Sequence, residues 1–279
     1  MLMSKRDRLH QAAQGLQALC CPVCGNGLQR EGETYSCGKH PFTVNKKGFL
    51  NFLSAPAPSC YDAELFQARR RVFDAGCYDA VADAIGELLP PKGTQKLLDA
   101  GCGDGWYLQR ILQSRPDWHG AGVDISRDAI AQAADHPCTA LWCVADLRRL
   151  PFADQSFTAV LDVLTPASYS EFQRVLTQDG LLIKVFPGGE YLREIRAKRG
   201  MAPYEEGQVD AYLQEHGEVA DRRRVTVTLP VTSQLWRDFV FMTPLNQDLP
   251  PAEKEALAEN PADTVTVDLH VVACRLKKE

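Results

Sequence analysis

Three glycines alternate with small or acidic residues in the stretch Asp-Ala-Gly-Cys-Gly-Asp-Gly, residues 99–105. Glycine accepts positive φ angles and lets the backbone approach a ligand closely, because it has no Cβ. Apolar residues before the stretch predict a strand, and the apolar spacing of residues 107–112 predicts a helix after it. A turn between two such elements presents its ligand to a helix N-terminus at the carboxyl end of a strand. The stretch therefore predicts a ligand-binding turn of an open α/β sheet.

The residues around these glycines argue against a dinucleotide as the ligand. A dinucleotide turn of the form Gly-x-Gly-x-x-Gly needs a small residue at position 106, where this chain has Trp106. A carboxylate at Asp99 would repel a pyrophosphate, whereas it would attract a cationic amine. A Rossmann-like domain that binds some other nucleotide is the alternative.

Two further acids follow at the ends of two more apolar segments. Asp124 is placed to accept hydrogen bonds from a ribose diol, and Asp146 from an adenine amino group. An amine, a ribose and an adenine in this order describe S-adenosylmethionine. The residues expected to bind this cofactor are Asp99, Gly101, Gly103, Gly105, Asp124, Ile125, Asp146 and Leu147.

Two pairs of metal-ligand residues lie near the start of the chain. Cys21 and Cys24 form one Cys-x-x-Cys pair, and Cys37 and His40 follow after a polar, glycine-containing loop. Four such ligands close a tetrahedral Zn²⁺ site with no open position, so the expected role is structural. Cys20 competes with Cys21 as a ligand, and buried free thiols are the alternative to zinc.

Composition and charge set the wider expectations. No apolar run reaches the roughly 20 residues of a membrane span, and the N-terminus lacks the apolar core of a signal peptide, so a cytoplasmic protein is expected. The net charge is −5, but residues 1–71 carry 10 Lys/Arg against 5 Asp/Glu, a balance of +5. A basic N-terminal segment on an acidic body favours an RNA contact at one face. Chance surface charge is the alternative.

The elements that must position these residues follow an α/β order. Apolar strands and amphipathic helices alternate from residue 97 to residue 188, and residues 224–229 and 264–273 alternate with the period of strands. We expect a zinc-binding, RNA-recognising module in residues 1–55, then a linker at 56–59 and helices up to residue 92. Residues 93–279 should form the cofactor-binding domain.

The cofactor motifs resemble those of class I methyltransferases, and four further stretches narrow the resemblance. With the Cys-Pro-x-Cys pair, they resemble the 23S ribosomal RNA guanine-N1 methyltransferases, a family that includes macrolide-resistance enzymes. The stretches are Lys-Gly-Phe-Leu-Asn (47–51), Gln-Ala-Arg-Arg (67–70), Phe-Asp-Ala-Gly-x-Tyr (73–78) and Phe-Met-Thr-Pro (241–244). The resemblance implies a class I sheet with an N-terminal zinc module, S-adenosylmethionine as methyl donor and a 23S rRNA hairpin as partner. It also implies cofactor contacts from Tyr78, Gly103 and Asp104.

The chain departs from the family pattern at three places. The second metal pair is spaced by two residues instead of three. Tyr191 stands where the family has a cofactor-contacting histidine, and it is expected to bind the cofactor in its place. After the fourth strand, the stretch at residues 164–166 keeps only the family's proline. This last departure bears on the target base more than on the methyl donor.

The catalytic chemistry and the partners leave several alternatives open. Asp162, near the end of the fourth strand, is the candidate proton acceptor, with an ordinary strand carboxylate as the alternative. Trp106, Phe186 and Tyr191 are candidates for stacking on a flipped base, or for the core. A small-molecule methyltransferase and a zinc-dependent RNA-binding protein with a vestigial cofactor site are the rival functions. Both a monomer and a homodimer remain open.

Overall fold

The computed structural model describes residues 3–55, 63–90 and 93–277, so the expected linker at residues 56–59 lies outside the described residues. Its helices are α1 (Lys5–Leu16), α2 (Ala63–Asp74), α3 (Asp79–Leu88), α4 (Trp106–Ser114), α5 (Arg127–Ala133), α6 (Tyr169–Val175), α7 (Arg193–Lys198), α8 (Gln208–His216), α9 (Ser233–Met242) and α10 (Pro251–Ala258), with a 3-10 turn at Pro244–Asn246. Its strands are β1 (Gln29–Glu31), β2 (Thr34–Ser36), β3 (Pro41–Thr43), β4 (Leu50–Asn51), β5 (Lys96–Ala100), β6 (His119–Asp124), β7 (Ala140–Val144), β8 (Phe157–Val163), β9 (Leu176–Pro187), β10 (Gly217–Pro230) and β11 (Thr264–Leu276). None of the described helices is both long and apolar enough to cross a membrane.

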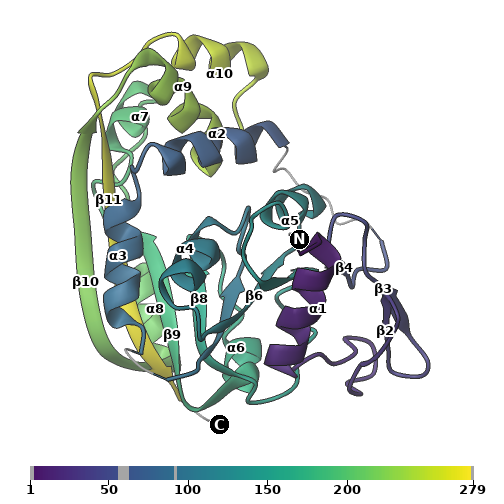
Figure 1. Cartoon of the computed structure of the whole chain (residues 1–279). Helices are drawn as coiled ribbons and strands as arrows, with labels where there is room; N and C mark the ends of the chain where they lie inside the picture. Colours follow the sequence, from purple (N-terminus) through teal and green to yellow (C-terminus); the bar gives the residue numbers. More distant parts are fainter. Residues whose placement is uncertain (1–2, 56–62, 91–92, 278–279) are drawn as a thin grey trace.

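A mixed sheet forms the centre of the described chain, with the strand order β10-β11-β9-β8-β5-β6-β7-β4 (Figure 1). The strands from β4 to β9 run parallel, and β11 and β10 join antiparallel to them. Consecutive strand residues point to opposite faces, so Leu97 packs in one apolar cluster and Leu98 in the other. Helices α3 and α4 cover the first face, and α1 and α6 cover the second. The predicted α/β class I methyltransferase sheet is confirmed.

The first 55 residues divide between this sheet and a small appended one. Helix α1 buries Leu9 and Leu16 in the same cluster as strand β7, and β4 pairs parallel with β7 at the end of the sheet. Strands β1, β2 and β3 form a separate three-stranded sheet, beyond α1 and β4 in Figure 1. The zinc-ligand segment therefore lies between two elements that belong to the main core.

Helices α2, α7, α9 and α10 gather above the carboxyl ends of the central strands (Figure 1). Arg71 of α2 donates two hydrogen bonds, of 2.7 and 2.9 Å, to the buried carboxylate of Asp238 in α9. Trp236 of α9 is fully buried, and its indole donates to the Leu257 carbonyl of α10 at 2.9 Å. These contacts hold α2, α9 and α10 together above the carboxyl edge of the sheet, where ligands bind in folds of this kind.

Candidate cofactor and metal sites

A cavity of about 500 Å³ lies at the carboxyl ends of β5, β6, β7 and β8, below α2. Of the residues expected to bind the cofactor, it is lined by Tyr78, Asp99, Gly101, Gly103, Asp104, Asp124, Ile125, Asp146, Leu147 and Tyr191. Gly105 is the one that does not line it. A Cβ on Gly105 would lie 2.4 Å from the ring of Trp142, and the φ of Gly105 is +77°. This glycine therefore serves the packing of the loop against β7.

The glycine loop is held against β6 by backbone hydrogen bonds. The N–H groups of Gly101 and Cys102 both donate to the Val123 carbonyl, at 2.8 and 3.0 Å. The Gly103 N–H donates to Asp124 Oδ2 at 2.9 Å, and the Ser126 N–H donates to Asp124 Oδ1 at 2.8 Å. Asp124 thus fixes the loop and faces the cavity at the same time.

The environment of Asp99 indicates a binding site for a cation. Its side chain is buried, and its Oδ2 has no hydrogen-bond partner among the described residues. Burial, followed by the nearby carboxylates of Asp124, Asp162 and Asp104, raises the pKa of Asp99 to about 8. A cationic amine placed here would favour the ionised form of Asp99 and provide its missing partner.

Two arginines of α2 point toward this site. Arg69 lines the cavity, and its guanidinium donates to the Met242 carbonyl at 3.3 Å. Arg70 pairs with the buried Asp104 at 3.0 Å, so it ties α2 to the glycine loop. Both arginines therefore have partners inside the protein.

Tyr191 lies against Tyr78, although 113 residues separate them in the chain. Their hydroxyl groups are 2.8 Å apart in a hydrogen bond, and both side chains line the cavity. Burial raises the pKa of both hydroxyls, so each stays neutral and can donate as well as accept. The tyrosine that replaces the family histidine therefore still belongs to the cavity wall.

Asp162, the candidate proton acceptor, does not line the cavity. Its fully buried carboxylate pairs with Lys184 at 2.9 Å, and the same Lys184 ammonium donates to the Thr165 carbonyl at 2.6 Å. This ion pair fixes the turn after β8, which supports the structural alternative for Asp162. Thr165 does line the cavity, and a Cβ on Gly101 would lie 2.6 Å from its hydroxyl.

Two of the candidate stacking residues belong to the core. Trp106 packs against Phe73 with ring centroids 4.7 Å apart, and Phe186 stacks on His270 at 5.1 Å. Neither Trp106 nor Phe186 lines the cavity, whereas Tyr191 does. Sequence reasoning missed Phe66, Arg69 and Thr243 as wall residues. The Gln-Ala-Arg-Arg and Phe-Met-Thr-Pro stretches were the signal that could have identified Arg69 and Thr243.

The four expected metal ligands converge at the three-stranded sheet. The ligand atoms of Cys21, Cys24, Cys37 and His40 all lie within 4.8 Å of one another. His40 Nδ1 lies 3.4 Å from the sulfurs of both Cys21 and Cys37, and the sulfurs of Cys24 and Cys37 are 3.6 Å apart. A tetrahedral zinc with bonds of about 2.1–2.3 Å separates its ligand atoms by about 3.5–3.8 Å. The donor set therefore fits a structural zinc ion, and Cys20 is not part of it.

The environment of Cys37 favours its thiolate, whereas burial raises the pKa of Cys21. The pKa of Cys37 is lowered to about 6, chiefly by the Lys39 backbone N–H and then by that of His40. A thiolate is the form of cysteine that binds zinc. This geometry supports metal binding over the alternative of buried free thiols.

The chain was compared with known proteins. A methyltransferase-domain family model matches residues 97–180. A solved structure, the YcgJ protein of Bacillus subtilis, superimposes with a TM-score of 0.50 at 15% identity, covering 72% of this chain and 99% of that one, and shows the shared fold.

Two relatives extend over nearly the whole chain. The YxjB protein of Bacillus subtilis, which is named a 23S rRNA (guanine-N(1)-)-methyltransferase, is 33% identical over 90% of this chain and 95% of its own length. The 23S rRNA (guanine(748)-N(1))-methyltransferase of Streptomyces fradiae is 28% identical over 92% of this chain and 96% of its own. The chain therefore belongs to the 23S rRNA (guanine-N1)-methyltransferases, which are S-adenosylmethionine-dependent enzymes.

Proposed function

We propose that this enzyme methylates N1 of a guanine in a hairpin of 23S rRNA, and that a structural zinc in its N-terminal module helps to hold the RNA. The observation that carries the proposal is the cavity into which Asp99, Asp124 and Asp146 project from the carboxyl ends of three neighbouring parallel strands, or from just beyond them. A ribosomal RNA substrate also implies action in the cytoplasm. Family membership makes RNA the substrate class.

Each acid has a separate task in the cavity. Asp99 would accept from the amino group of S-adenosylmethionine, Asp124 from its ribose hydroxyls and Asp146 from its adenine amino group. When bound, S-adenosylmethionine supplies an electrophilic methyl group. The main work of the protein is then to orient donor and acceptor for an in-line displacement.

The target base must enter from the side of the turn after β8. N1 lies on the Watson–Crick edge of guanine, so the base has to be unpaired before it can react. Leu164 lines the cavity, is 40% exposed and has a φ of 55°, an unusual backbone conformation for leucine. Such strain at a cavity wall is typical of functional positions, and we assign Leu164 to the base-facing side.

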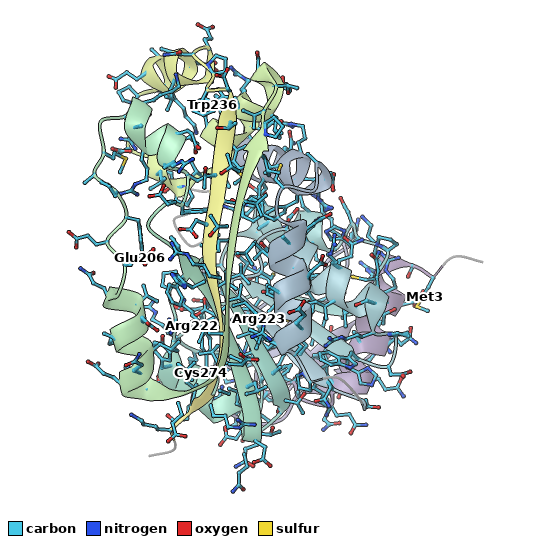
Figure 2. The ribbon with its side chains drawn as sticks, turned by 90° about the vertical axis from the view of Figure 1, so that its left-hand side faces the viewer. Met3, Glu206, Arg222, Arg223, Trp236 and Cys274 are labelled. Carbon is cyan, nitrogen blue, oxygen red and sulfur yellow. The ribbon has the colours of Figure 1, made fainter. Side chains whose placement is uncertain are left out.

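Three exposed basic side chains available for RNA lie at the turns of the small N-terminal sheet. Lys39, Lys46 and Lys47 are exposed, the last two at the turn between β3 and β4. By contrast, the arginine run of β10 in Figure 2 is paired with acids: Arg222 with Asp210, and Arg223 with Asp221. These contacts favour the N-terminal module as the phosphate-binding face.

The activity is tested by mapping modified nucleosides of ribosomal RNA from cells with and without the gene. We expect N1-methylguanosine to be missing at one position of 23S rRNA when the gene is absent. N1-methylation blocks base pairing, so primer extension should stop at that position in RNA from the parent strain. Identical nucleoside maps from both strains would favour the small-molecule alternative.

Replacing Lys46 and Lys47 together by alanine should weaken binding to many RNA sequences alike. Counterion release makes the logarithm of the binding constant fall with the logarithm of salt concentration, by roughly 0.7–0.9 per phosphate neutralised. The double variant should therefore make this slope shallower by about 1–2 units. The measurement is a salt titration of binding to a 23S rRNA hairpin fragment.

The matched control is Lys198→Ala, which removes an exposed lysine of α7, far from the N-terminal module. Its slope should equal that of the unmodified protein. An unchanged slope in the double variant would exclude this turn as a phosphate contact.

A further inference from the structure

One segment of the chain contacts both the cavity and the metal site. Asp146, Leu147 and Arg148 follow β7 and line the cavity. The next residue, Arg149, donates from its guanidinium to the Val23 carbonyl at 2.8 Å. Val23 lies inside the turn between the ligands Cys21 and Cys24. Two adjacent residues therefore serve the two sites: Arg148 lines the cavity, and Arg149 contacts the metal-binding turn.

Backbone hydrogen bonds tie the first ligand pair to the same segment. The Cys20 N–H donates to the Pro151 carbonyl at 3.0 Å, and the Ala153 N–H donates to the Ala18 carbonyl at 2.8 Å. Leu19 and Phe152 form an antiparallel bridge between these two bonds. The entry to the metal-binding turn is therefore a short strand pair with residues 151–153.

The second ligand pair is tied to the other end of the segment. His40 leads directly into β3 and then into β4, which pairs with β7 at Cys143 and Val144. The Phe52 N–H extends this pairing by donating to the Val144 carbonyl at 2.9 Å. The first half of the metal site is thus bonded directly to residues that follow positions 146–148, and the second half is joined through β3 and β4 to the strand that precedes them.

The interior of the segment has little freedom to absorb a displacement. Leu150 and Phe152 are fully buried, and the Leu150 N–H donates to the Glu171 carboxylate at 2.7 Å. In contrast, Cys21 is buried but residues 23–27 of the ligand turn are exposed, with Val23 at 53%. The order of the ligand turn therefore depends most on the metal. A displacement of this turn would be passed on to residues 146–153.

From this arrangement, we infer that metal binding at the four ligands and cofactor binding in the cavity are energetically coupled through residues 146–153, with Arg149 as a positioning residue. The inference rests on the proposed zinc and cofactor sites. A metal-ordered turn holds Arg149 and Pro151 in place, and these hold Asp146 and Leu147 at the cavity wall. The cofactor binds only when these wall residues are ordered. It therefore binds more tightly when a bound metal ion has already ordered them.

The coupling is measured in both directions with zinc and S-adenosylhomocysteine. By calorimetry, the zinc-loaded protein should bind S-adenosylhomocysteine about 5- to 30-fold more tightly than protein depleted of metal by a chelator. Reciprocity requires that saturating S-adenosylhomocysteine raise the zinc affinity, read by competition with a chromophoric chelator, by the same factor. The second measurement begins from folded, metal-loaded protein, so the metal-free form does not have to be prepared beforehand.

Arg149→Ala should keep its zinc but reduce the coupling factor to about one-third or less, because one of the contacts to the turn is lost. Arg149→Lys retains a donor toward the Val23 carbonyl and should restore most of the coupling. Arg30→Ala is the matched control, since Arg30 lies on the same small sheet and its guanidinium donates to the Gly32 carbonyl of its own turn. It should leave the coupling unchanged.

The outcomes separate this inference from the proposed function. Equal affinities for S-adenosylhomocysteine with and without zinc, while both ligands bind, would overturn the coupling and leave the function standing. Coupling that is equal in Arg149→Ala and Arg30→Ala would remove the role of Arg149. A protein that binds neither zinc nor S-adenosylhomocysteine would contradict both the inference and the proposed function.

Discussion

Asp99→Asn should weaken the binding of S-adenosylmethionine by roughly 30- to 1,000-fold, or about 2–4 kcal/mol. The carboxylate of Asp99 is buried, and one of its oxygens has no partner among the described residues. The ammonium group of the cofactor would supply that partner, whereas an amide would leave the ammonium buried without a counter-charge. Calorimetry with S-adenosylhomocysteine, which carries the same ammonium group, measures the loss.

The same carboxyl predicts how binding depends on pH. Because the pKa of Asp99 is raised to about 8, most of the free protein must release a proton before it can bind an ammonium at neutral pH. The dissociation constant should therefore fall by up to about tenfold per unit as pH rises from 6 to 8. In Asp99→Asn this dependence should disappear. Asp128→Asn, a matched change at an exposed position of α5, should behave as the unmodified protein does.

Stability should change in the opposite direction to binding. A carboxyl whose pKa is raised from 3.8 to about 8 on folding contributes stability below pH 4 that is lost as pH rises through 8. At pH 8 the unliganded Asp99→Asn variant should therefore be more stable than the unmodified protein, by roughly 2–5 kcal/mol, and at pH 4 equally stable. Thermal melts at the two pH values test this. A variant that loses stability at pH 8, or binds the cofactor unchanged, would contradict the assignment of Asp99.

Cys24→Ser should abolish stoichiometric metal binding. Protein purified without chelator is expected to carry about one zinc per chain, and structural zinc sites are held by roughly 10–16 kcal/mol at neutral pH, to which every ligand contributes. Elemental analysis gives the metal content. Cys20→Ala is the matched control, because Cys20 lies next to the ligands but outside the ligand cluster, and it should retain the metal.

The structure also limits how far the loss of metal should spread. Leu9 and Leu16 of α1, and Leu50 of β4, are buried in the main core. Hydrogen exchange in Cys24→Ser should therefore rise sharply between the ligand turns, in residues 21–47, while α1 and β4 stay protected. Full metal content in Cys24→Ser, or equal metal loss in Cys20→Ala, would refute the ligand assignment. Loss of protection in α1 would show instead that residues 1–55 fold as one unit.

Much of the cofactor site could be predicted because its features are local or follow from topology. A strand, a glycine turn and a helix that are contiguous in sequence stay together in space. The carboxyl ends of parallel strands meet at one edge of a sheet, so Asp99, Asp124 and Asp146 converge whenever their strands are neighbours. The four candidate metal ligands were predictable for the same reason, since each pair lies within one tight turn.

The sequence by itself thus determined the class of fold, the three acids of the cavity and the four candidate ligands, whereas the tertiary structure decided the roles of residues whose partners are distant. Arg70 forms an ion pair with Asp104 of the glycine loop, and Asp162 forms one with Lys184 on the neighbouring strand. The position of α1 and β4 on the main sheet was equally hidden, because a short amphipathic helix and a two-residue strand carry almost no local signal. Such pairings form only when the whole chain packs, because each buried charge then needs a partner and each apolar face needs a surface to pack against. No periodicity along the sequence predicts which partner or surface that will be.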